Sequence, residues 1–142
     1  MSYFFSPADV DVENPPPGTP SVSLNIHQMR TVREVLRELG VARDNLPQAL
    51  EAKGFAHTER SLDMKKLRSN DGWHITADEC TFLAERVDAG IAQGLHALYA
   101  SFNDEPTAEE LAAWLSELAA FARGAAPRGG MRVYGGGAGA IC

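Results

Sequence analysis

The fold of this chain is decided by the stretch from Thr76 to Leu98, TADECTFLAERVDAGIAQGLHAL. It begins with a capping box, in which the Thr76 side chain accepts from the Glu79 amide and the Glu79 side chain bonds back to Thr76. Apolar residues then recur at helical spacing: Cys80, Leu83, Val87, Ile91, Leu95 and Leu98. The stretch therefore predicts one long helix with one buried face. Gly90 and Gly94 each weaken such a helix by about 1 kcal/mol relative to Ala, which predicts another backbone packed close against it.

Two more amphipathic helices flank this one. A second capping box at Thr107–Glu110 precedes a stripe of large apolar residues: Leu111, Trp114, Leu115, Leu118 and Phe121. Upstream, Asn25 offers an N-cap oxygen, and Gly40 offers a left-handed stop to the helix between them. The apolar positions of that earlier helix are Ile26, Met29, Val32, Leu36 and Leu39. A short fourth helix is predicted around Leu46, Ala49 and Leu50.

Short strands fill the intervals between the helices. The predicted strands are Tyr3–Phe5, Ser21–Leu24, Trp73–Ile75 after the turn Asn70-Asp71-Gly72, and Met131–Tyr134. Few helices separate neighbouring strands, so the order favours an α+β fold over a doubly wound parallel one. We expect a small antiparallel or mixed sheet of short strands covered by about three to four helices. The segment 55–69 fits neither the helical nor the strand period.

The chain divides by composition into three parts. Residues 1–20 form an N-terminal segment with the Pro-rich loop PPPGTP at 15–20, which cannot form helix or a central strand. Residues 21–134 are predicted to be a single globular α+β domain. Residues 135–142, GGGAGAIC, are predicted to be a flexible Gly-rich tail.

Composition narrows the classes of function. The net charge is -6 and the few basic residues are diluted by acids, which disfavours nucleic-acid binding. No secretion signal opens the chain, and no stretch approaches the roughly 20 apolar residues that cross a bilayer. The two cysteines form no disulfide framework. We therefore expect a cytoplasmic protein without a membrane partner.

One group of reactive side chains invites a catalytic or metal-site interpretation: His74, Asp78, Glu79 and Cys80. The last three are consecutive on a helix and fan through about 300°, so they cannot face one point. Capping and core packing account for Glu79 and Cys80. The sequence thus predicts no catalytic, cofactor-binding or metal-ligating residues, and it leans toward a protein that is not an enzyme.

An acidic run is the main functional signal. Between residues 104 and 122 there are five acids and no base: Asp104, Glu105, Glu109, Glu110 and Glu117. Acids are favoured at a helix N-terminus, so a solvated helix explains the run without any partner. The functional interpretation is a salt-sensitive contact with a basic protein partner.

Two further hypotheses belong to other classes. A small-molecule binder or small enzyme would place a pocket near residues 55–75, with Trp73 and His74 as its candidate residues. A self-assembling structural subunit is the third possibility, and its oligomeric state would be visible in solution.

The order of these elements resembles a group of small bacterial α+β proteins. The features that carry the resemblance are the aromatic opening strand, the turn followed by Thr76-Ala77-Asp78-Glu79, the long helix, and the closing segments Phe121-Ala122-Arg123 and Gly129–Tyr134. It spans most of residues 21–134 and carries no catalytic residue. Some proteins of this kind act as immunity or accessory factors, so the resemblance implies an interaction role.

Overall fold

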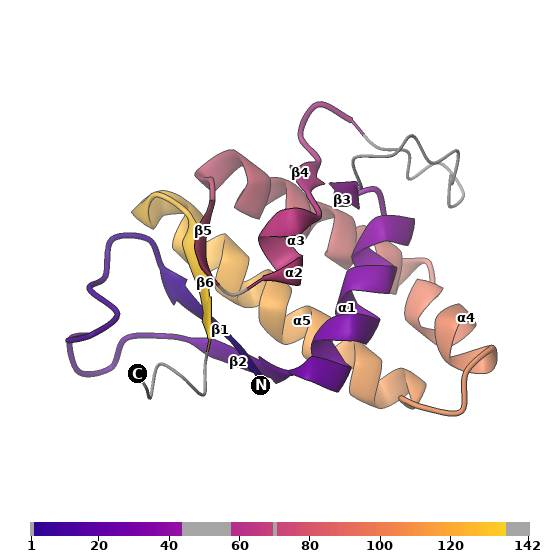
Figure 1. The fold of residues 1–142 in the computed structure, drawn as a ribbon. Helices are drawn as coiled ribbons and strands as arrows, with labels where there is room; N and C mark the ends of the chain where they lie inside the picture. Colours follow the sequence, from indigo (N-terminus) through magenta and orange to yellow (C-terminus); the bar gives the residue numbers. More distant parts are fainter. Residues whose placement is uncertain (1, 44–57, 70, 136–142) are drawn as a thin grey trace.

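The computed structural model describes residues 2–43, 58–69 and 71–135. The predicted short helix around Leu46 and the Gly-rich tail after Gly135 lie outside the described residues. Figure 1 shows an elongated molecule, with a sheet at one end, α4 at the other, and the helices α1, α3 and α5 between them.

The main sheet has four strands in the order β2-β1-β6-β5. They are β1 (Ser2–Pro7), β2 (Val22–Asn25), β5 (Asp71–Ile75) and β6 (Met131–Gly135). Every neighbouring pair is antiparallel, and the predicted strands are all present. The first and last strands of the chain lie side by side in the centre of the sheet, so the fold closes only when both ends have been brought together.

One face of this sheet is packed against the helices. Its buried side chains are Tyr3, Phe5, Val22, Leu24, Ile75, Met131 and Val133. In β2 and in the first half of β1 they alternate with more exposed residues, as the period of a half-buried sheet requires. The α+β prediction, with a small antiparallel sheet covered by helices, is confirmed.

Three long helices cover the sheet and build the core. They are α1 (Ile26–Glu38), α3 (Ala77–Ala92) and α5 (Ala108–Ala125), and α3 packs most extensively against α5. The capping boxes predicted at Thr76 and Thr107 are present, and Asn25 forms a third one with Gln28. Gly40 has the predicted left-handed conformation, with φ of 74°.

The segment that fitted no period contains two short elements. Leu62–Asp63 is a strand, β4, that pairs in parallel with β3 (Ala42–Arg43). It is followed by α2 (Lys65–Arg68), and Phe55–His57 lie outside the described residues. A single turn of helix and strands of two residues are too short to show a period.

The prediction of one helix from Thr76 through Leu98 is wrong. The helix α3 ends at Ala92, and a separate helix, α4 (Leu95–Ser101), follows. Gly94 separates them, with a left-handed φ of 78° that a residue with a Cβ adopts only at a cost. Leu98 is consequently not part of a buried stripe, since 42% of it is exposed.

The prediction that another backbone packs close against Gly90 and Gly94 is wrong: Gly90 faces a side chain, and a Cβ on Gly94 would meet nothing within 4 Å. A Cβ on Gly90 would lie 2.5 Å from the Leu39 Cδ2 atom. Leu39, at the end of α1, is itself buried. The missing side chain on α3 therefore leaves room for the Leu39 side chain.

Candidate interaction surface

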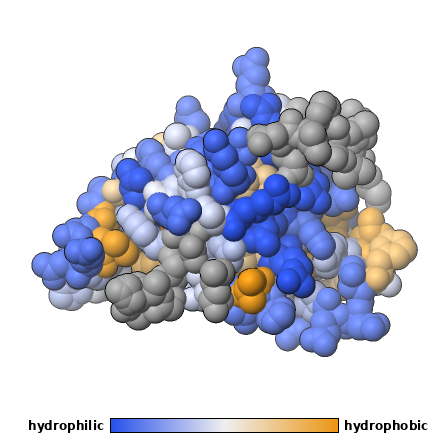
Figure 2. Space-filling model, viewed as in Figure 1, coloured by the Kyte–Doolittle hydropathy of each residue, from blue (hydrophilic) through white to orange (hydrophobic). Residues whose placement is uncertain are grey.

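The helix α4 differs from the other helices longer than one turn because none of its residues is buried. Among the described residues, the exposed large hydrophobic side chains are Leu98, on α4, and Phe102, directly after it. Phe102 is 80% exposed, an unfavourable position for a ring of that size unless a partner covers it. In Figure 2 an apolar patch marks the end of the molecule where Figure 1 places α4.

These side chains border an apolar groove between α1 and α4. Its volume is about 250 Å³. Val35, Glu38 and Leu39 line it from α1. Leu95, Leu98, Tyr99 and Phe102 line it from α4 and the residue that follows. One lining residue, Glu38, carries a formal charge, so the groove combines a mostly apolar lining with one carboxylate.

Two glycines give this groove its shape. Gly94 ends α3 and sets the new direction of α4. Gly90 leaves room for Leu39, which packs against α3 and lines the groove from the side of α1. The shape of the groove thus depends on two glycines, which are poor helix formers.

A hydrogen bond joins the two walls. The Tyr99 hydroxyl donates to the Glu34 carboxylate at 3.1 Å. Burial, followed by this hydrogen bond to Glu34, raises the pKa of Tyr99 above its usual value of 10. The neutral Tyr99 hydroxyl holds α4 against α1 through this hydrogen bond.

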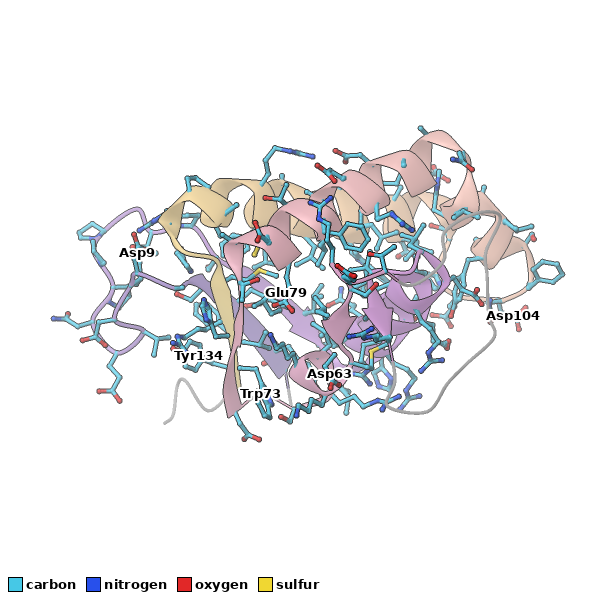
Figure 3. All side chains as sticks on the ribbon, turned by 90° about the horizontal axis from the view of Figure 1, so that it is seen from above. Asp9, Asp63, Trp73, Glu79, Asp104 and Tyr134 are labelled. Atoms are coloured by element: carbon cyan, nitrogen blue, oxygen red, sulfur yellow. The ribbon has the colours of Figure 1, made fainter. Side chains whose placement is uncertain are left out.

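The five predicted acidic residues are all exposed. Asp104 and Glu105 lie in the loop after α4, while Glu109 and Glu110 occupy the first turn of α5, and Glu117 follows two turns later. Figure 3 shows Asp104 at one end of the molecule and Asp9 toward the other, with Trp73 and Tyr134 between them. No Lys or Arg occurs between residues 87 and 122, so the stretch without basic residues includes α4, which itself carries no acid.

The five acids are not equivalent. The Glu110 carboxylate accepts from the Thr107 amide at 3.0 Å and so completes the capping box of α5. Glu105 and Glu110 also line a second, polar groove of about 400 Å³ that includes Arg30 and Trp114. Asp104 lies outside that groove's lining, in the loop that follows Phe102. Of the five acids, Asp104 and Glu105 are the nearest in the chain to Phe102, which lines the apolar groove.

Trp73 and His74, the predicted pocket residues, are on β5 and have local partners. The Trp73 indole donates to the Ser69 hydroxyl at 2.6 Å, and the Lys65 ammonium lies 5.3 Å from the ring centroid. His74 Nε2 is 2.8 Å from the Gly129 carbonyl oxygen. As neighbours on a strand, the two side chains point to opposite faces. The pocket near residues 55–75 stays a prediction, since part of that segment lies outside the described residues.

The group around Cys80 is likewise engaged in local contacts. Glu79 accepts from the Thr76 amide and from the Lys66 ammonium, the latter at 2.8 Å. Cys80 is fully buried, and burial, with a smaller contribution from Glu79, raises its pKa to about 12. Its place in the first turn of α3 therefore does not yield a reactive thiolate, because desolvation outweighs the helix dipole.

Within residues 2–43, 58–69 and 71–135, no three His, Cys, Asp or Glu side chains are arranged to hold a metal ion. Over the same residues, no helix has the length and apolar character needed to cross a membrane. Comparison with models of protein families, with curated proteins and with solved structures found no match.

Sequence reasoning missed the apolar groove because it assigned Leu95 and Leu98 to a buried stripe. Two signals were present. Gly94 offers a helix end, and Phe102 stands in the otherwise polar segment Ser101-Phe102-Asn103-Asp104-Glu105. A large apolar residue flanked by turn-forming and acidic residues is not placed there by the needs of a core.

Proposed function

We propose that this protein is a non-enzymatic binding module of the cytoplasm, an accessory or immunity-like factor whose partner is a basic protein. The partner docks on the surface formed by the α1/α4 groove, Phe102 and the acidic loop residues Asp104 and Glu105, which we call the α4 face. Nucleic acid and membranes are not its partners.

The observation that carries this proposal is the exposure of Phe102 beside Leu98. Apolar side chains in the centre of a contact with charged residues at its rim are typical of protein interfaces. In the proposed contact Asp104 and Glu105, which are exposed and follow Phe102 in the chain, supply that rim. Two of the five acids predicted from sequence would then border the apolar site.

The local partners of the reactive side chains support binding over catalysis. Glu79 and His74 both form hydrogen bonds within the fold, and the Cys80 thiol is sealed in the core. A side chain that acts on a substrate needs access to it. The acids and apolar residues of the α4 face have that access.

Affinity capture with a tagged full-length chain tests the proposal. We expect a stoichiometric Lys- and Arg-rich partner at low salt that is released at high salt, because screening weakens exposed charge contacts. Reversal of the rim charges, Asp104→Lys with Glu105→Lys, should abolish capture. The matched control, Glu13→Lys with Glu59→Lys, makes the same change in net charge at exposed positions on other elements and should capture normally.

The rim variant avoids Glu110, whose loss would also remove the cap of α5. Equal recovery of the partner by the rim variant and the wild type at low salt would refute the proposal. A nuclease or toxin gene beside the gene for this chain would identify the immunity-like role that the bacterial resemblance implies.

The two rival functions make different predictions. A self-assembling subunit would elute as an oligomer in gel filtration with light scattering. A small-molecule binder would gain thermal stability in a metabolite screen, because a ligand that binds only the native state raises apparent stability.

A further inference from the structure

We propose that the α1/α4 groove receives one amphipathic α-helix of the partner, with apolar residues on the buried stripe and Lys or Arg beside it. This inference rests on the proposed function and specifies the shape and charge of what binds. Three properties of the groove support it: its size, the hydrogen bonding of its walls and its charge.

The size of the groove suits a few side chains. Its volume of about 250 Å³ lies just below the roughly 300–1,000 Å³ typical of small-molecule pockets. The apolar lining from Val35, Leu39 and Leu95 offers dispersion contacts and desolvation, with Phe102 and Leu98 at the margin. Side chains projecting from one face of a partner would fill it.

The walls offer an incoming backbone few hydrogen-bond partners. Both walls are helices, whose amides and carbonyls bond within the helix except in the first and last turns. At the end of α4 the Tyr99 carbonyl already accepts from Phe102 and from the Asn103 side chain, and the Leu98 carbonyl accepts from the Ser101 hydroxyl. A segment entering this groove must therefore satisfy its own peptide groups. An α-helix does so, whereas an extended strand needs an open sheet edge.

The charges around the groove select a basic occupant. Glu38 lines it, Glu34 holds Tyr99 from one turn earlier, and the acidic loop residues follow Phe102. The α4 residues and the loop to Pro106 contain no Lys or Arg. A second copy of this chain would bring the same acids into contact with one another, at an energetic cost. A helix with flanking Lys or Arg would be attracted.

Fluorescence anisotropy with a synthetic probe tests this inference. The probe is a labelled peptide of about four helical turns, with Leu at i, i+3, i+4 and i+7 and Lys on the remaining positions. The full chain should bind it at low salt. Phe102→Ser and Leu98→Ser should each weaken binding about tenfold or more, because central apolar anchors dominate such contacts. Ala97→Ser, at an exposed neighbouring position of α4 outside the groove lining, is the matched control and should bind as the wild type does.

Two control peptides separate shape from charge. A shuffled peptide of the same composition has no apolar stripe and should bind at least tenfold more weakly. A peptide with the stripe retained and Glu in place of Lys should lose the low-salt binding. Equal affinity for the shuffled peptide, or no effect of Phe102→Ser, would overturn the inference.

The outcomes distinguish this inference from the proposed function. In one outcome, Phe102→Ser abolishes capture of a protein partner while the helical probe does not bind at all. That result would refute the inference that the occupant is a helix, but it would support the proposed binding function. A dimer that Phe102→Ser dissociates would show that a second copy covers the groove and would overturn both. Absence of any captured partner would refute the proposed function directly.

Discussion

One continuous pattern of apolar residues spans the helices α3 and α4, yet the apolar side chains of α3 are buried and those of α4 are not. In α3 the stripe is sealed, with Cys80, Leu83 and Val87 fully buried. In α4 no residue is buried, and Leu98 stands half-exposed beside the bare ring of Phe102. Two residues, Gln93 and Gly94, separate the helices.

This difference shows that helical spacing of apolar residues indicates a helix without indicating what covers its apolar side. The helix α3 packs mainly against α5, whereas α4 lies at the end of the molecule away from the sheet (Figure 1). Only partial contact with α1 and α5 remains there. We propose that a partner covers the apolar residues of α4 that the core leaves exposed.

The largest expected effect is a difference in the free energy of unfolding between substitutions in the apolar stripe of α3 and in that of α4. Leu83→Ala should lower the free energy of unfolding by about 2–5 kcal/mol, because it leaves a cavity in the core. Leu98→Ala should change it by no more than about 0.5 kcal/mol, as surface substitutions do. Urea unfolding measures both. A similar cost at the two positions would mean that α4 is as fully packed as α3.

Thiol reactivity tests the same contrast without removing core atoms. In a Cys142→Ser background, Cys80 should react with a thiol reagent at pH 8 roughly a thousandfold more slowly than an ordinary thiol, because its pKa of about 12 suppresses the thiolate. Adding Leu98→Cys should introduce one fast-reacting thiol. Rapid labelling of Cys80 in the folded protein would contradict the sealed stripe, and unfolding in urea should restore its reactivity.

A smaller effect is expected at the break between the helices. Gly94→Ala places a Cβ at a φ of 78° and should destabilise by about 1–2 kcal/mol. Its control is Gly124→Ala, inside α5, where a Cβ would meet open space and should stabilise by about 0.5–1 kcal/mol. Thermal unfolding would show shifts of opposite sign. If Gly94→Ala raised both stability and helix content, α3 and α4 would behave as one helix.

The smallest effect concerns the hydrogen bond that holds α4. Tyr99→Phe should cost about 0.5–1.5 kcal/mol by removing the donor to Glu34. Folding raises the pKa of Tyr99, so its contribution is present below pH 10 and declines as the pH rises through the higher folded value. Unfolding measured from pH 8 to above pH 10 should therefore show the wild type losing its advantage. A pH-independent difference from Tyr99→Phe would contradict this role.

Much of the fold follows from local rules in the sequence. The capping boxes at Thr76 and Thr107 fix two helix starts, and Asn25 and Gly40 bracket a third helix. The strand at Met131–Tyr134 follows from alternation and the glycines before it. These signals are visible in sequence because each depends on residues a few positions apart.

The rest depends on contacts between distant residues. The role of Gly90 is decided by Leu39, and that of Gly94 by the left-handed backbone it adopts between the two helices. The parallel pair β3–β4 joins two strands that are too short to show a period in the sequence. The acidic run was predicted residue by residue, but its apolar neighbour was not, since exposure of Leu98 and Phe102 is a property of the assembled molecule.

Hydrogen–deuterium exchange on the complex with the captured basic partner tests the central claim most directly. At low salt the partner should protect the amides of α4 and residues 102–106, together with the second half of α1, and high salt should remove that protection. Protection confined to the sheet or to the Pro-rich loop, with α4 exchanging as in the free protein, would contradict the assignment of the α4 face.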